Sequence, residues 1–417
     1  MSMESQDKFV AKRGKTYLNR EELEAHLASV IRLENIGVLL GAGASISAGG
    51  KTMGDVWKSF KDDYSDSADW LQKKTFFNDD SINVEELLDT LEIAEKEWIR
   101  QGKTKLTKQL QKAKADLYRS IIKASVLQDK WWNSPHLVDL DDGKLDSHRA
   151  LLQALCGSRQ VGQPAPWIFT TNYDLAMEWA GETLGWKINN GFEGLHNRIF
   201  SPHVFDLGYS NLSARGEARF GTYGFFLAKL HGSLSWQELD GEYLEYPAAT
   251  IWSDIQNFLD KKDNHKLPIV FPSAAKYIQT VGFVLGELLR RFTEFLSKSQ
   301  TCLITIGYSF SDSHLNQIVK RALLNPTLQL VICLPELEKF DGNNININKS
   351  IQSILKLESP QITIIGGKEK AFFDSFVTYL PQPVIYDEYA LKIKKLINEN
   401  KEQNTPARED IGIGENM

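Results

Sequence analysis

The sequence predicts an α/β protein built on a doubly wound parallel sheet that carries a helical insertion. Short apolar runs alternate with amphipathic helical patterns, as expected when helices connect parallel strands. Polar residues and glycines directly follow several of these runs, as they do at the ligand-binding edge of such a sheet. Between the first two runs, a long stretch has helical periodicity and few strand signals, which predicts the insertion.

The first strand is expected at Ile36–Leu40, after a helix that begins with a capping box at Asn19. The strand ends in a loop of small residues, Gly41–Ser45, and a helical pattern follows. This order is typical of a nucleotide-binding α/β unit, because glycines let a pyrophosphate approach the loop backbone and helix N-terminal amides can face the anion.

Two known phosphate-binding loops fit this stretch poorly. A dinucleotide fingerprint needs a third glycine where the chain has Ile46, and a P-loop ending at Lys51-Thr52 needs a glycine in place of Ser45. A tight strand-to-helix turn that binds nothing therefore stays open as an alternative when this loop is considered alone.

The helical insertion is expected over about residues 57–150. It contains two long amphipathic patterns, Leu87–Trp98 after a capping box at Asn83, and Leu106–Ile122 after Gly102. Lysines occupy the other face between Lys103 and Lys114, and such a face is more often solvated than a binding site.

Six further short apolar runs predict the remaining strands. They are Pro166–Phe169, Phe225–Leu230, Pro268–Phe271, Cys302–Ile306, Leu328–Leu334 and Ile362–Ile365. The stretch from Gly181 to Gly224 is rich in glycine, asparagine, serine and aromatic residues. We expect it to form an elaborated loop or a small β excursion at the edge of the sheet.

Composition excludes several classes of protein. The chain has 417 residues, of which 42% are hydrophobic and 24% charged, as in ordinary globular proteins. A net charge of −6 argues against a protein that mainly coats nucleic acid. No apolar run approaches a membrane-spanning length, and three scattered cysteines fit a reducing compartment, so a cytoplasmic location is expected. No zinc signature occurs, and no metal is assigned.

Four polar segments each follow a predicted strand. They are Gly41–Ser45, Thr171–Asp174, His231–Ser233 and Gly307–Asp312. Taken singly, an Asn-x-Asp or His-Gly sequence is more often a turn or a helix cap than a site. Because the carboxyl ends of parallel strands line one crevice, all four are expected to meet around one ligand.

These four segments resemble motifs of the sirtuins. Gly41–Ser45 is similar to the sirtuin glycine loop, Thr171–Asp174 to the Thr-Asn-x-Asp element and His231-Gly232 to the His-Gly element. Gly307–Asp312 resembles the form found in the bacterial sirtuin-like branch. Order and spacing agree over about residues 20–375, which implies a Rossmann-like domain at 19–390, between an N-terminal segment (1–18) and a C-terminal helix and polar tail (391–417).

The chain departs from protein-deacylating sirtuins at two points. Those enzymes carry Pro-Asp-Phe-Arg soon after the glycine loop, where this chain reads Gly50-Lys51-Thr52-Met53. They also carry a four-cysteine zinc module, which three scattered cysteines cannot build. The resemblance therefore favours the branch that breaks down NAD in antiphage defence, whose members in some cases pair with a HerA-type hexameric ATPase.

The resemblance implies an NAD glycohydrolase and assigns roles to its residues. Asn172 would hold a ribose hydroxyl or the attacking water, His231 would accept a proton, and Asp174 would position the loop. The other residues expected to contact NAD are Gly41, Ala42, Gly43, Ser45, Thr171, Gly307, Ser309 and Asp312.

Restraint of such an activity implies a homo-oligomer or a partner ATPase, with nucleic acid contacted only through that partner. Other activities stay open: an NAD-dependent deacylase, an ADP-ribosyltransferase, a cyclising enzyme, or a non-catalytic scaffold that senses NAD or ADP-ribose.

Overall fold

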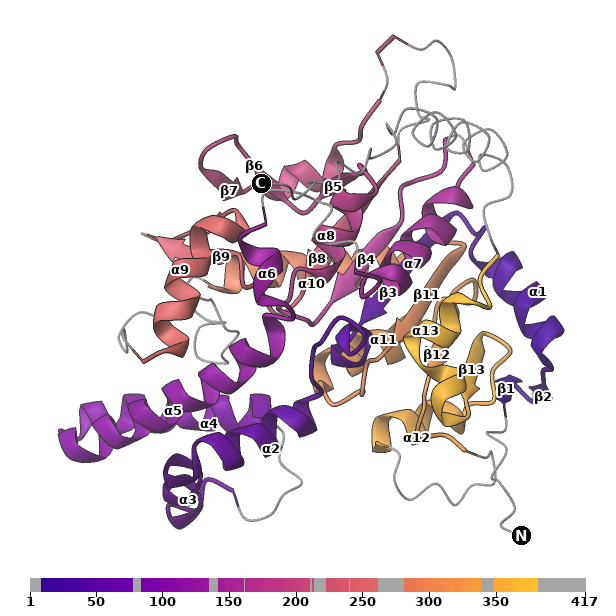
Figure 1. Cartoon of the computed structure of the whole chain (residues 1–417). Helices are drawn as coiled ribbons and strands as arrows, with labels where there is room; N and C mark the ends of the chain where they lie inside the picture. The colour runs from indigo at the N-terminus through magenta and orange to yellow at the C-terminus, as the bar shows by residue number, and fades with distance from the viewer. Residues whose placement is uncertain are drawn as a thin grey trace, which may run out of the picture. The chain divides into compact units, whose positions relative to one another are not determined.

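The computed structural model describes residues 9–77, 84–134, 142–160, 162–210, 212–213, 223–239, 241–261, 281–338 and 348–381 (Figure 1). All of these residues belong to one unit, Met1–Pro381. The predicted strand at Pro268–Phe271, the capping residue Asn83 and the C-terminal helix and tail lie outside the described residues.

A nine-stranded sheet with the order β2-β1-β13-β12-β11-β3-β4-β8-β5 forms the centre of this unit. All neighbouring pairs from β13 to β5 are parallel, which confirms the predicted parallel sheet. The strands are β1 (Val10–Arg13), β2 (Thr16–Tyr17), β3 (Asn35–Leu40), β4 (Trp167–Thr170), β5 (Lys187–Asn189), β8 (Gly224–Lys229), β11 (Thr301–Ile306), β12 (Gln329–Cys333) and β13 (Ile362–Gly366).

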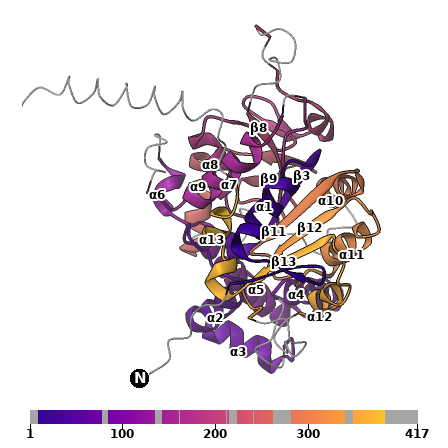
Figure 2. The same ribbon diagram turned by 90° about the vertical axis from the view of Figure 1, so that its right-hand side faces the viewer.

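Helices cover both faces of the sheet, as the doubly wound arrangement requires (Figure 2). Alternate residues of β3 show this directly, since Val38 and Leu40 belong to the core on one face and Leu39 to the core on the other. The first face packs against α1 (Arg20–Val30), α7 (Asp146–Gly157), α8 (Ala176–Thr183) and α13 (Phe373–Val377). The second packs against α10 (Val281–Ser297), α11 (Ser313–Ala322) and α12 (Lys349–Leu355).

The capping box predicted at Asn19 is confirmed. Its side chain accepts a hydrogen bond from the Glu22 amide at 2.9 Å, and the Glu22 carboxylate accepts one from the Asn19 amide at 2.8 Å. This cap fixes the start of α1, which delivers the chain into β3.

The helical insertion between β3 and β4 has a core of its own. It comprises α2 (Met53–Asp63), α3 (Ser65–Lys73), α4 (Val84–Arg100), α5 (Thr104–Ser125) and α6 (Asp129–Trp132), and α9 (Ala248–Leu259) packs with them. The ring centroids of Trp131 and Trp132 lie 5.3 and 5.5 Å from that of Trp179 in α8. The insertion therefore packs on the helix that follows β4.

The structure adds strands at the N-terminus, which sequence patterns do not indicate, and it confirms the small β excursion that was one of the two expectations for Gly181–Gly224. β1 and β2, within the expected N-terminal segment, pair antiparallel at one edge of the sheet. The stretch after Gly181 contributes β5 to the main sheet. A second, antiparallel sheet is ordered β6-β7-β10-β9, with β6 (Phe192–Glu193), β7 (Arg198–Phe200), β9 (Trp236–Leu239) and β10 (Glu242–Glu245). The structure also contains the short 3-10 helices η3 (Pro202–Asp206) and η5 (Lys368–Ala371).

Candidate active site

The order of the strands creates a crevice at the carboxyl end of β3. In the sheet, β3 has β4, the next strand of the parallel sheet along the chain, as its neighbour on one side and β11, which comes much later in the chain, as its neighbour on the other. The loops after these strands diverge at such a switch point, where ligands of open α/β sheets bind. The predicted glycine loop lies here and forms a short turn, η1 (Ala42–Ser45), before α2 begins at Met53.

Glycines at this crevice are required by the packing of two loops against each other. A Cβ on Gly41 would lie 2.5 Å from the carbonyl oxygen of Gly307, and a Cβ on Gly307 would lie 2.3 Å from the amide nitrogen of Ala44. Gly307 also has a φ of +62°, and the Gly43 amide donates to its carbonyl at 3.0 Å. The sequence suggests that these glycines admit a pyrophosphate; the structure adds that they let the two loops touch.

A cavity of about 570 Å³ opens beside these loops, a size common for small-molecule sites. All four polar segments contribute to its wall. Every residue predicted to act on or contact NAD lines it: Gly41, Ala42, Gly43, Ser45, Thr171, Asn172, Asp174, His231, Gly307, Ser309 and Asp312. Segments more than a hundred residues apart in the chain thus share one pocket.

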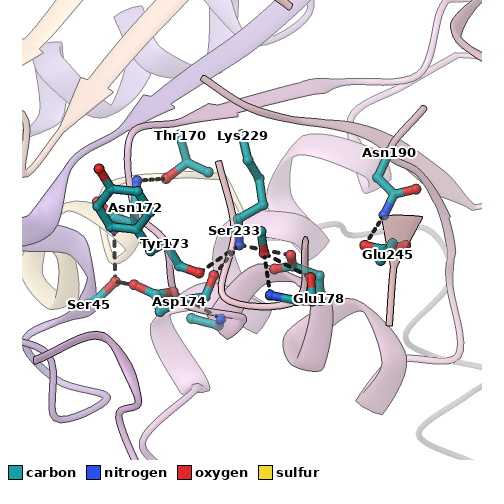
Figure 3. Close-up of polar contacts among 12 residues, drawn as sticks. Ser45, Thr170, Asn172, Tyr173, Asp174, Glu178, Asn190, Lys229, Ser233 and Glu245 are labelled. Carbon is teal, nitrogen blue, oxygen red and sulfur yellow. Dashed lines mark hydrogen bonds and ion pairs between the residues drawn. The ribbon is translucent and has the colours of Figure 1, made fainter. Parts of the chain in front are cut away.

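Asn172 is held by the glycine loop (Figure 3). Its Nδ2 donates to the Gly41 carbonyl and to Ser45 Oγ, both at 2.9 Å, and Ser45 Oγ donates to Asp174 Oδ2 at 2.7 Å. The other oxygen of Asp174 accepts the Ala176 amide at 3.0 Å, which fixes the start of α8. Because both amide hydrogens of Asn172 are engaged, the group that it can offer a ligand is the acceptor Oδ1.

His231 is held by Asp312. Its Nε2 lies 3.0 Å from Asp312 Oδ2, while Asp312 Oδ1 accepts the amides of His314 and Leu315 at 2.7 and 3.0 Å and caps α11. Burial raises the pKa of Asp312, but the hydrogen bond with His231 and those with the helix amides outweigh it, so the pKa is below its usual range. A carboxylate in this position orients the imidazole.

Comparison with known proteins adds an independent finding. The model of the SIR2-like domain matches residues 166–351, a stretch that contains three of the four polar segments and excludes the glycine loop. The match supports a sirtuin-like family. SIR2-like proteins are NAD-dependent enzymes, so the match suggests an NAD-related activity for this chain. No curated protein matches the chain.

Other residues outside the four polar segments also line the cavity. Ile121 and Ala124 of α5 line it, as do Lys51 after the glycine loop and Phe372 and Asp374 at the start of α13. Lys51 is the one lysine or arginine among the described lining residues, and its Nζ donates to Ser59 Oγ at 2.9 Å. The position of Lys51 close to the glycine loop could have indicated a ligand contact from the sequence alone. The apolar residues of α5 could not, because their pattern is that of an ordinary helix core.

Two observations concern metals and membranes. Among the residues that the structure describes, no group of three or more His, Cys, Asp or Glu side chains is placed to hold a metal ion. Cys156, Cys302 and Cys333 are free thiols, and burial raises the pKa of each. Within the described ranges, no helix has both the length and the apolar character needed to cross a bilayer.

Replacement of Asp312 by asparagine should make the stability of this protein less sensitive to acid. A carboxylate whose pKa is lowered by folding contributes stability above its unfolded pKa of about 4, and loses that contribution as the pH falls through the folded value. Asparagine keeps the helix cap but does not titrate. The free energy of urea unfolding should therefore fall less steeply between pH 5 and pH 3 in Asp312→Asn than in wild type. Equal slopes would show that the paired carboxylate adds nothing.

Proposed function

We propose that this protein is an NAD glycohydrolase that releases nicotinamide and ADP-ribose. The observation that carries the proposal is the shared cavity, in which Asn172 and His231 are each held by a separate hydrogen-bond network next to two packed glycine loops. This is the arrangement expected of preorganised groups around a single reacting ribose.

The chemistry requires a protein that stabilises positive charge. Breaking the nicotinamide–ribose bond leaves a cation resembling an oxocarbenium ion, and nicotinamide departs as a neutral molecule without a general acid. The lining carries the carboxylates of Asp174, Asp312, Glu336 and Asp374 against the single cation of Lys51 among its described residues. Negative charge inside a cavity of low dielectric favours the developing cation.

Water completes the reaction by adding to the ribose carbon and losing one proton. Asn172 Oδ1 accepts a hydrogen bond from that water or from a ribose hydroxyl. His231 takes the proton, and Asp312 stabilises the imidazolium that results. Lys51 and the hydroxyl of Ser309 are the lining groups suited to the pyrophosphate.

Hydrolysis of NAD is favoured over the removal of acyl groups from protein lysines by the chain's composition. Its three cysteines cannot form the four-cysteine module that shapes the acyl-lysine groove of deacylating sirtuins. An unrestrained NAD hydrolase would kill its own cell. We therefore propose a role as an antiphage effector that acts by NAD depletion, restrained by self-assembly or by a HerA-type hexameric ATPase.

Product analysis tests this function. Full-length protein, alone and with the product of the neighbouring gene, is incubated with NAD, and the products are separated by chromatography. We expect equal amounts of nicotinamide and ADP-ribose, with no acceleration by an acetylated peptide. Peptide-dependent release would indicate a deacylase, cyclic ADP-ribose a cyclising enzyme, and tight binding of NAD without turnover in every assembly state a sensing scaffold. Each of these three results would overturn the proposal.

A further inference from the structure

A lysine is buried beneath the two loops that carry the candidate catalytic residues. Lys229, the last residue of β8, is 2% exposed and lies two residues before His231. Its Nζ donates to Glu178 Oε1 of α8 at 2.9 Å, to the Tyr173 carbonyl at 3.4 Å and to the Asp174 carbonyl (Figure 3). Lys229 does not line the cavity, so its effect on a ligand must pass through the loops.

Lys229 joins the Asn172 loop (Thr171–Asp174) to the His231 loop (His231–Leu234). It belongs to the strand that leads into the His231 loop, and it holds two main-chain carbonyls of the Asn172 loop. The Tyr173 carbonyl also accepts the Leu234 amide at 2.9 Å. The position of one loop relative to the other therefore depends on this ammonium group.

The ammonium is fully satisfied although it lies in the core. Its three N–H donors meet one carboxylate and two carbonyl oxygens. Burial raises the pKa of Glu178 to about 7, against the opposing effect of Lys229. Because an apolar pair of similar volume is often at least as stable as a buried ion pair, stability alone gives little reason for these two residues.

We propose that Lys229, paired with Glu178, is a positioning residue for NAD cleavage, which fixes the Asn172 loop against the His231 loop. Its kinetic consequences rest on the proposed function, whereas its effect on the loop does not. A displacement of about 1 Å in a reacting group costs roughly a hundredfold in rate, so the loss of this anchor should act on kcat.

The test compares Lys229→Met with Lys114→Met in the full-length protein. Lys114 is a matched control, because it is a largely buried lysine on α5 that pairs with Glu95 at 2.6 Å and does not line the cavity. In Lys229→Met we expect kcat to fall roughly a hundredfold, while the Kd for ADP-ribose changes less than about threefold. Hydrogen exchange should become faster at residues 171–176 in this variant and stay unchanged there in Lys114→Met.

The outcomes separate this inference from the proposed function. If wild-type protein does not hydrolyse NAD, the proposed function fails, and exchange at residues 171–176 still decides whether Lys229 holds the loop. Should Lys229→Met not fold, Glu178→Leu/Lys229→Met takes its place, since it leaves no unpaired buried charge. Unchanged exchange at the loop would overturn the inference. Faster exchange throughout the chain, with ADP-ribose binding lost alongside kcat, would also overturn it, as would failure of both variants to fold.

Discussion

His231→Ala and Asn172→Ala should each lower NAD turnover by about 10²–10⁴-fold, the usual contribution of a positioned proton acceptor or hydrogen-bonding group. His231→Ala removes the imidazole that Asp312 holds, and Asn172→Ala removes the Oδ1 acceptor together with the bonds to Gly41 and Ser45. The release of nicotinamide measures the effect. Circular dichroism should show that both variants are folded, because both residues lie on loops that follow strands of the sheet.

His203→Ala is the matched control for this pair. His203 is exposed, bonds Ser201 at 2.6 Å and does not line the cavity. Its turnover should equal that of wild type. If a folded variant, His231→Ala or Asn172→Ala, kept full turnover, the side chain replaced in it would not take part in the reaction.

Gly307→Ala should give the largest loss of stability. The new methyl group would lie 2.3 Å from the Ala44 amide nitrogen, at a residue with a φ of +62°. Left-handed strain and a backbone clash together are expected to cost roughly 3–5 kcal/mol in the free energy of urea unfolding. The clash occurs where the two glycine loops meet, so NAD turnover should be lost with the stability.

Substitutions at two other glycines separate the effect of left-handed strain from the effect of the backbone clash. Gly102 has a φ of +69° but open space around it, so Gly102→Ala should cost only the left-handed strain, about 1 kcal/mol. Gly286 lies within α10 with nothing nearby, and Gly286→Ala should stabilise the helix by up to about 1 kcal/mol. A loss in Gly307→Ala no larger than that in Gly102→Ala would mean that the glycine loops do not need their close contact.

The strands were predictable because burial on both faces leaves continuous apolar runs. All six residues of β3 and all six of β11 are buried, and both read as clear strands in the sequence. The same reasoning located the polar segments, since each directly follows such a run. β1 and β2 lack this signal, because they are short, lie at the edge and leave most residues partly exposed.

Hydrogen bonds between residues far apart in the chain could not be predicted from the sequence. His231 and Asp312 are 81 positions apart, and Ser45 and Asp174 are 129 apart, so neither spacing indicates a contact. The sequence predicts an NAD contact for Asp312, and the structure shows in addition that Asp312 holds His231 and caps α11. Lys229 was hidden within an apolar run, because a lysine in a strand normally reads as a residue that faces solvent.

A structure of the His231→Ala variant with NAD tests the central claim most directly, because the substrate should survive in that variant. The account predicts NAD in the cavity, with its nicotinamide ribose between Asn172 and position 231 and its pyrophosphate against Gly41–Ser45. NAD bound outside this cavity, or with its nicotinamide ribose away from Asn172, would contradict it.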